Sequence, residues 1–106
     1  MSIFKVDFEA MEWEEGREGV RHKTYREGTR QIRLVEFDTT EGGPGWCQLG
    51  HIGLVLAGGL VIDFNGTVVS FSAGDGLFIP PGAATAHRGL TIAPGTRLLM
   101  VEDAET

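Results

Sequence analysis

Three residues in the middle of the chain carry side chains that bind metals or move protons: Cys47, His51 and His87. A thiolate with two imidazoles suits zinc, copper or iron, and three protein ligands leave a position open for catalysis. An imidazole also serves as a general acid or base, because its ordinary pKa lies near neutrality. His51 and His87 are therefore candidate catalytic residues, and all three are candidate ligands of one divalent transition metal (Zn, Fe, Mn, Ni or Cu).

The spacing of Cys47 and His51 leaves two interpretations open. In an extended strand their even separation places both side chains on the same face, with Cα atoms about 13 Å apart. One metal ion cannot be held across that distance unless Gly50 allows a bulge or a bend. In the alternative, Cys47 is a small core residue, His51 an interior histidine with satisfied hydrogen bonds, and His87 a residue at the rim.

Short strands separated by turns must position these residues. Apolar residues recur at every second position, as in Leu60, Ile62 and Phe64. Asn65-Gly66 predicts a tight hairpin, because a type I′ turn needs positive φ at both central residues. Sixteen glycines, and no ten-residue stretch with a helical period, favour an all-β sandwich or barrel. The predicted strands include residues 20–26, 31–37, 60–64, 67–71, 77–79 and 96–102.

Length and charge limit the function classes. A chain of 106 residues predicts one domain over residues 1–106. The net charge of −6 argues against a nucleic-acid partner, which needs a positive patch. There is no apolar window of about 20 residues and no basic, apolar leader, so we expect no membrane association and a cytoplasmic protein. One cysteine cannot form an internal disulfide, which fits a reducing compartment.

The stretch from residue 46 to residue 89 resembles the cupin superfamily, in particular small, single-domain cupins of the type 2 kind. The resemblance is carried by Leu54-Val-Leu-Ala-Gly58, the hairpin Asn65-Gly66, and Ala73-Gly-Asp-Gly-Leu-Phe-Ile-Pro-Pro-Gly82 before His87. It implies a jelly-roll β-barrel of two antiparallel sheets. It also implies a homodimer formed through edge strands.

The same resemblance implies a metal inside the barrel, although the usual ligands are replaced. In cupins, two histidines and a glutamate come from the first motif and a third histidine from the second. With Gly58 aligned to the glycine of the family, the glutamate position becomes His51, and the two histidine positions become Gly45 and Cys47. The last histidine position lies two residues before His87. The set that remains is Cys47, His51 and His87.

Three functions follow as hypotheses. The first is a cupin that binds a small metabolite with weak or no catalysis, in a mostly apolar pocket. The second is a metal-dependent enzyme of the dioxygenase or sugar-isomerase type that uses the three candidate ligands. The third is a structural or regulatory module that packs against a partner. The expected pocket lining, beyond the two histidines and Leu54, consists of Trp46, Phe64, Phe78 and Met100.

Overall fold

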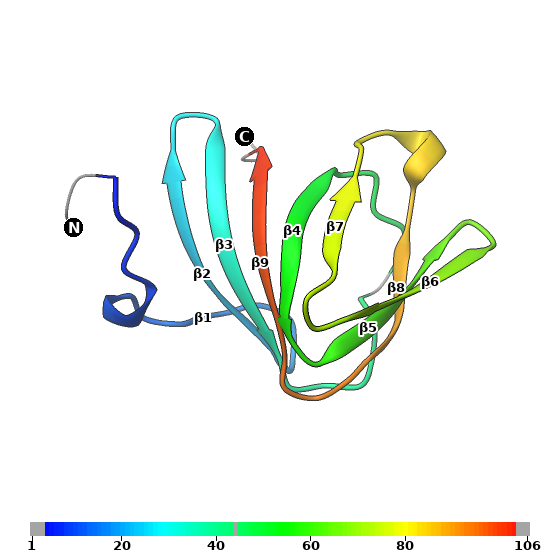
Figure 1. Ribbon diagram of the computed structural model, residues 1–106, viewed down its shortest axis with the longest axis horizontal. Helices are drawn as coiled ribbons and strands as arrows, with labels where there is room; N and C mark the ends of the chain where they lie inside the picture. Colours follow the sequence, from blue (N-terminus) through cyan, green and yellow to red (C-terminus); the bar gives the residue numbers. More distant parts are fainter. Residues whose placement is uncertain (1–3, 44, 104–106) are drawn as a thin grey trace.

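Alternating apolar residues and the turns between them produce a succession of short strands. The computed structural model describes residues 4–43 and 45–103 (Figure 1). Each of the six strands predicted above is confirmed, with ends that agree within one residue. In chain order the elements are η1 (Phe8–Ala10), β1 (Glu14–Glu15), β2 (Val20–Glu27), β3 (Arg30–Phe37), β4 (His51–Ala57), β5 (Gly59–Phe64), β6 (Thr67–Ser72), β7 (Gly76–Ile79), η2 (Ala83–Thr85), β8 (Arg88–Ile92) and β9 (Thr96–Asp103).

The strands form two sheets. The larger sheet has the order β1-β2-β3-β9-β4-β7, and the smaller one has the order β6-β5-β8. Neighbouring strands in both sheets are antiparallel. Figure 1 shows the small sheet at the side of the large sheet where β4 and β7 lie. The prediction of an all-β architecture with two antiparallel sheets is therefore confirmed.

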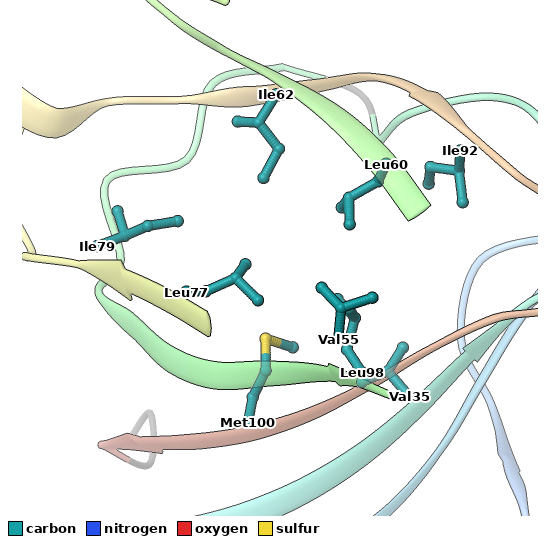
Figure 2. Close-up of a cluster of buried hydrophobic side chains, with 9 residues drawn as sticks. All are labelled: Val35, Val55, Leu60, Ile62, Leu77, Ile79, Ile92, Leu98 and Met100. Carbon is teal, nitrogen blue, oxygen red and sulfur yellow. The ribbon is translucent and has the colours of Figure 1, made fainter. Parts of the chain in front are cut away.

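The hydrophobic core lies between the two sheets (Figure 2). Burying side chains of this size contributes roughly 1.5–3 kcal/mol each, which is the main stabilisation available to so small a chain. Strand β9 shows the alternation most clearly, because its even-numbered positions are buried from Thr96 to Glu102. The core residues are Val35, Val55, Leu77, Ile79, Leu98 and Met100 from the large sheet, and Leu60, Ile62 and Ile92 from the small sheet.

The hairpin between β5 and β6 has the geometry that its sequence predicts. Asn65 and Gly66 both have positive φ, 55° and 107°. The carboxylate of Asp63 accepts a hydrogen bond of 2.7 Å from the backbone N–H of Gly66, which stabilises the turn. Asp63 also lies 3.5 Å from Arg88 of β8, and its side chain is only 13% exposed. The Asp63 carboxylate therefore contributes both to the turn and to the contact with the neighbouring strand.

The two 3-10 helices are three residues each. Within residues 4–43 and 45–103, no helix has the length and apolar character needed to cross a membrane.

Candidate metal centre

Three separate segments bring Cys47, His51 and His87 together. Cys47 lies in the loop before β4, His51 is the first residue of β4, and His87 directly precedes β8. Backbone hydrogen bonds join Cys47 to His87 in both directions, at 2.7 and 2.9 Å. The Cys47 Sγ atom lies 3.8 Å from His51 Nε2, and the two imidazole centroids are 5.2 Å apart. One ligand atom from each residue lies within 4.8 Å of the other two.

The chain achieves this by leaving the extended course between residues 47 and 51. Cys47 pairs with His87 instead of continuing β4, which begins only at His51. Gly50 lies against the end of β7, where an added Cβ would be 2.9 Å from Pro81 and 3.0 Å from the carbonyl oxygen of Ile79. A separation of about 13 Å, which an extended strand would give, does not apply. The ligand atoms of Cys47 and His51 lie close enough to share one site.

Hydrogen bonds set the tautomer of both histidines. His51 Nδ1 lies 2.7 Å from the Glu102 carboxylate, and His87 Nδ1 lies 3.0 Å from the carbonyl oxygen of Thr85. A carboxylate and a carbonyl only accept hydrogen bonds, so Nδ1 is the donor in each ring. The lone pair is then on Nε2, which in His51 is the nitrogen near Cys47 Sγ. Metal-binding histidines are commonly held in this way.

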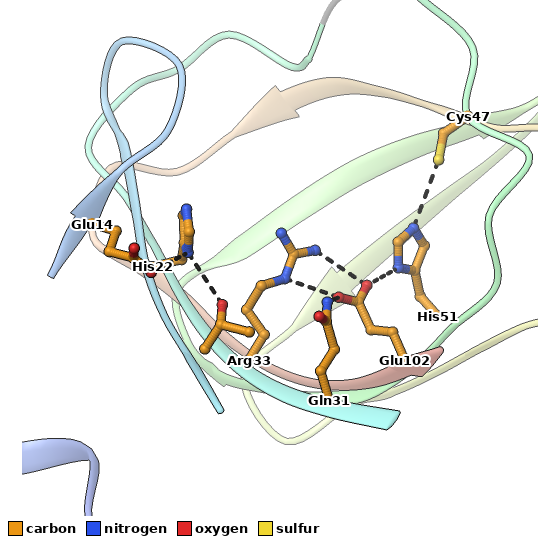
Figure 3. A network of polar contacts seen from close by, with 8 residues as sticks. Glu14, His22, Gln31, Arg33, Cys47, His51 and Glu102 are labelled. Atoms are coloured by element: carbon orange, nitrogen blue, oxygen red, sulfur yellow. Dashed lines mark hydrogen bonds and ion pairs between the residues drawn. The ribbon is translucent and has the colours of Figure 1, made fainter. Parts of the chain in front are cut away.

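Glu102 is the centre of a polar network behind His51 (Figure 3). Gln31 donates to Oε1 at 3.0 Å, and Arg33 Nη2 donates to Oε2 at 3.1 Å. Arg33 Nε lies 2.9 Å from Oε1 in an ion pair, but this buried nitrogen lacks hydrogen-bond geometry. Arg33 therefore makes a charge contact through Nε and a hydrogen bond through Nη2.

These contacts keep Glu102 ionised. Burial raises the pKa of Glu102, because it penalises the charged form. The hydrogen bond with His51, the positive charge of Arg33 and the hydrogen bond from Gln31 outweigh burial and lower the pKa from 4.5 to about 2. The imidazole of His51 therefore faces a carboxylate at neutral pH.

Sequence reasoning missed Glu102, although a signal for it exists. Glu102 follows Leu98 and Met100 at every second position of β9, on the face that supplies the core. A carboxylate continuing an apolar face needs a buried partner. Arg33 is one of these partners.

Two of the four residues expected to line a pocket lie in the interior. Phe64 contacts His87, with ring centroids 5.7 Å apart. Met100 is buried in the core. Trp46 is 47% exposed, and the guanidinium of Arg88 lies over its ring at 4.8 Å. Trp46 is therefore partly held by a surface cation–π contact.

Phe78 does not line the interior, and this prediction was wrong. Its side chain is 77% exposed, whereas Leu77 and Ile79 on either side of it are buried. Successive side chains of a strand point to opposite faces, so the two neighbours that fill the core direct Phe78 outward. Leu54 of β4 was also expected in the lining. Its side chain is exposed on the outer face of the sheet for the same reason.

A cavity of about 210 Å³ adjoins the network. Its wall includes Glu102 and the residues that lead into His51, so it lies beside the candidate centre. The lining is Gln31, Arg33, Leu49, Gly50, Glu102 and Asp103.

Comparison with known proteins identifies the fold. No family model matches the chain, and no curated protein matches it. KdgF from Halomonas sp. is similar over 100% of this chain and 96% of its own, with a TM-score of 0.79 and 20% identity. An RmlC-like cupin from Shewanella frigidimarina has a TM-score of 0.77 and 20% identity, covering 98% of this chain and 93% of its own. The polyketide cyclase RemF from Streptomyces resistomycificus has a TM-score of 0.78 and 19% identity, covering 98% of this chain and 81% of its own.

Proposed function

We propose that this chain, which has the cupin jelly-roll fold, binds a small molecule at a divalent transition metal held by Cys47, His51 and His87. The observation that carries the proposal is the convergence of one sulfur and two imidazoles within 4.8 Å. Both Nδ1 atoms are occupied by acceptors, so each ring keeps an Nε2 lone pair for a ligand bond. A metal bound by these histidines would require such free Nε2 lone pairs.

The donor set favours zinc or copper among the candidate metals. Thiolate and imidazole are the ligands that these ions prefer, while Mn²⁺ and Mg²⁺ prefer carboxylate and carbonyl oxygens. Three protein ligands leave a position for water or substrate, as in catalytic zinc sites. A metal bound there would act as a Lewis acid on a carbonyl or hydroxyl oxygen of the bound molecule.

The surrounding side chains suit a small ligand that is rich in oxygen. Gln31 and Arg33 supply hydrogen-bond donors in the wall of the cavity beside the centre, and Asp103 supplies acceptors. Phe64, packed against His87, provides an apolar surface on another side of the centre. A reducing compartment such as the cytoplasm would keep Cys47 as a thiol that can bind metal.

Catalysis at this centre is the second candidate function. The open coordination position favours it, and one structural neighbour is named a polyketide cyclase. The reaction would then act on an oxygen-bearing small molecule. Substrate screening would begin with isomerisation, cyclisation and oxygen-dependent reactions, each compared between metal-loaded and chelator-treated protein.

Metal content tests the proposal directly. Protein purified without an affinity tag should contain about one equivalent of zinc or copper, or take it up on reconstitution. Cys47→Ser, His51→Ala and His87→Ala should each lose most of it. The matched control is His22→Ala, because His22 on β2 contacts Thr24 and Glu14 and not the centre. A wild-type protein that takes up no transition metal, or an equal loss in the His22 variant, would refute the site.

A further inference from the structure

Glu102 lies one imidazole away from the candidate ligands and is not among them. Its Oε2 contacts His51 Nδ1 at 2.7 Å, whereas the cluster of mutually close ligand atoms contains only Cys47, His51 and His87. Both carboxylate oxygens are also occupied on their other sides, by Gln31 and Arg33. Glu102 is therefore held away from the metal position and acts only on the far nitrogen of His51.

We propose that Glu102 is a positioning residue, which fixes His51 in its Nδ1–H tautomer and directs the Nε2 lone pair toward the metal. This inference rests on the metal centre proposed above. A neutral imidazole with a free choice of tautomer would spend part of its time with a proton on Nε2, where it cannot bind a metal. The acceptor at Nδ1 removes that state, and its negative charge makes Nε2 a stronger donor.

The position of Glu102 in β9 makes it a rigid support. β9 lies between β3 and β4 in the large sheet, and Gln31 is the direct cross-strand partner of Glu102. Only 9% of Glu102 is exposed, and it continues the row of buried residues that begins at Thr96. The carboxylate is therefore aimed by a central strand, not by a loop.

Arg33 offsets the energetic cost of burying the Glu102 carboxylate. An ionised carboxylate away from water is costly unless it is paired and hydrogen-bonded. Arg33 and Gln31 both direct N–H groups at Glu102. Because a guanidinium has donors and no acceptor, Arg33 can donate to the oxygen of an amide at position 102 but cannot accept from its NH₂ group.

Glu102→Gln provides the sharpest variant. At the place of Oε1 an amide oxygen would meet two nitrogens, Gln31 Nε2 and Arg33 Nε, so it should take that place. The NH₂ group then replaces Oε2, faces His51 Nδ1, and leaves Arg33 Nη2 without its acceptor. An NH₂ group donates, so His51 would have to accept at Nδ1 and carry its proton on Nε2. The substitution should therefore reverse the tautomer of one histidine while changing very little volume.

Glu36→Gln is the matched control. Glu36 accepts hydrogen bonds from Arg21 and Arg97, and these contacts lower its pKa. It resembles Glu102 in being a carboxylate paired with arginine on a strand of the large sheet. No hydrogen bond or ion pair joins Glu36 to a histidine in the part of the chain that the structure describes.

Nitrogen-15 NMR of histidine-labelled, metal-free protein reads the tautomer directly. Spectra would be taken at about pH 9, well above the ordinary histidine pKa of about 6.5. In wild-type protein, His51 and His87 should both show Nδ1–H. In Glu102→Gln, His51 should change to Nε2–H while His87, held by the Thr85 carbonyl, stays unchanged. Zinc affinity, measured by competition with a chelator, should fall about 10–100-fold in Glu102→Gln and stay near wild type in Glu36→Gln.

Two results would overturn the inference. One is an unchanged His51 tautomer in Glu102→Gln, and the other is an equal loss of zinc affinity in both glutamate variants. A wild-type protein that binds no metal would instead refute the proposed centre. The tautomer measurement needs no metal, so it would still decide whether Glu102 positions His51.

Discussion

At the scale of single residues, the candidate centre depends on a buried carboxylate that stays charged. The pKa of Glu102 is raised by burial, but it is lowered more strongly by His51, Arg33 and Gln31, to about 2. A carboxyl group whose pKa is lower in the folded state than in the unfolded state stabilises the fold above its unfolded pKa. That stabilisation is lost as the pH falls through the folded pKa.

We predict that this group makes the protein sensitive to acid. The contribution of Glu102 should be complete above about pH 5 and lost by about pH 2, because its pKa is 4.5 before and about 2 after folding. The expected difference is on the order of 3 kcal/mol. Urea unfolding of metal-free wild type and Glu102→Gln, from pH 2 to 7, measures it. The advantage of the wild type should shrink toward pH 2, and a difference independent of pH would contradict the prediction.

Sequence reasoning singled out the three candidate ligands but not the residues that surround them. Cys47, His51 and His87 stand out by residue type alone. Glu102 is 51 residues from His51 and 71 residues from Gln31, so only the pairing of β3, β9 and β4 brings them together. Periodicity indicates which face of β9 is buried, but it does not predict which residues of the other strands lie beside that face. The site could therefore be predicted as three residues, while its polar network could not.

At the scale of elements, the corner between β4 and β5 is fixed by Gly58 and Thr96. Gly58 has a φ of 73°, and a Cβ added there would lie 2.7 Å from Thr96 Cα. Thr96 is fully buried, and its hydroxyl accepts a 3.0 Å hydrogen bond from the N–H of Gly59. The start of β9 therefore packs directly against this turn, and only glycine fits there.

We predict that Gly58→Ala destabilises the fold by about 3 kcal/mol or more. The left-handed backbone costs a residue with a Cβ about 1–2 kcal/mol, and the overlap with Thr96 adds a cost of similar size. Gly28→Ala separates the two effects, because Gly28 has a φ of 62° and nothing within 4 Å of an added Cβ. Chemical unfolding should show a loss for Gly28→Ala of only about 1–2 kcal/mol. Equal losses in the two variants would show that the contact with Thr96 does not matter.

Elements were predicted better than the loops that join them. The turn at Asn65-Gly66 was predictable because its geometry depends on two adjacent residues. The bend between Cys47 and His51 was not, because it depends on the distant partner His87. The outward direction of Phe78 was missed because alternation alone does not say which residues of a three-residue apolar run face the core.

At the scale of the whole molecule, the outer face of the large sheet carries an uncovered apolar patch. It comprises Ile52 and Leu54 of β4, Phe78 of β7 and Val101 of β9, which are 36–77% exposed. Ile52 lies directly between Phe78 and Val101 in the sheet register, so the patch is continuous. Contiguous exposed apolar surface of this kind is typical of interaction sites.

We propose that a second copy of the chain covers this apolar patch. Each copy carries a net charge of −6, but the four side chains of this patch are uncharged, so a contact between two patches brings no like charges of these residues together. In a two-fold contact, each copy would lay this face of the large sheet against the same face of the other copy. An isologous contact would then bring Phe78 of each copy close to the two-fold axis. The cupin resemblance also implies a homodimer, although through edge strands and not through this face.

Phe78→Lys should convert the dimer into monomers. The substitution places a charge at the centre of the apolar contact and removes an aromatic anchor, for which losses of about 2 kcal/mol or more are usual. The dissociation constant should therefore rise at least about 30-fold. Val68→Lys is the control, because Val68 of β6 is 56% exposed on the other sheet. Sedimentation equilibrium should show dimers for wild type and Val68→Lys, and a monomeric wild type or a dimeric Phe78→Lys would exclude this interface.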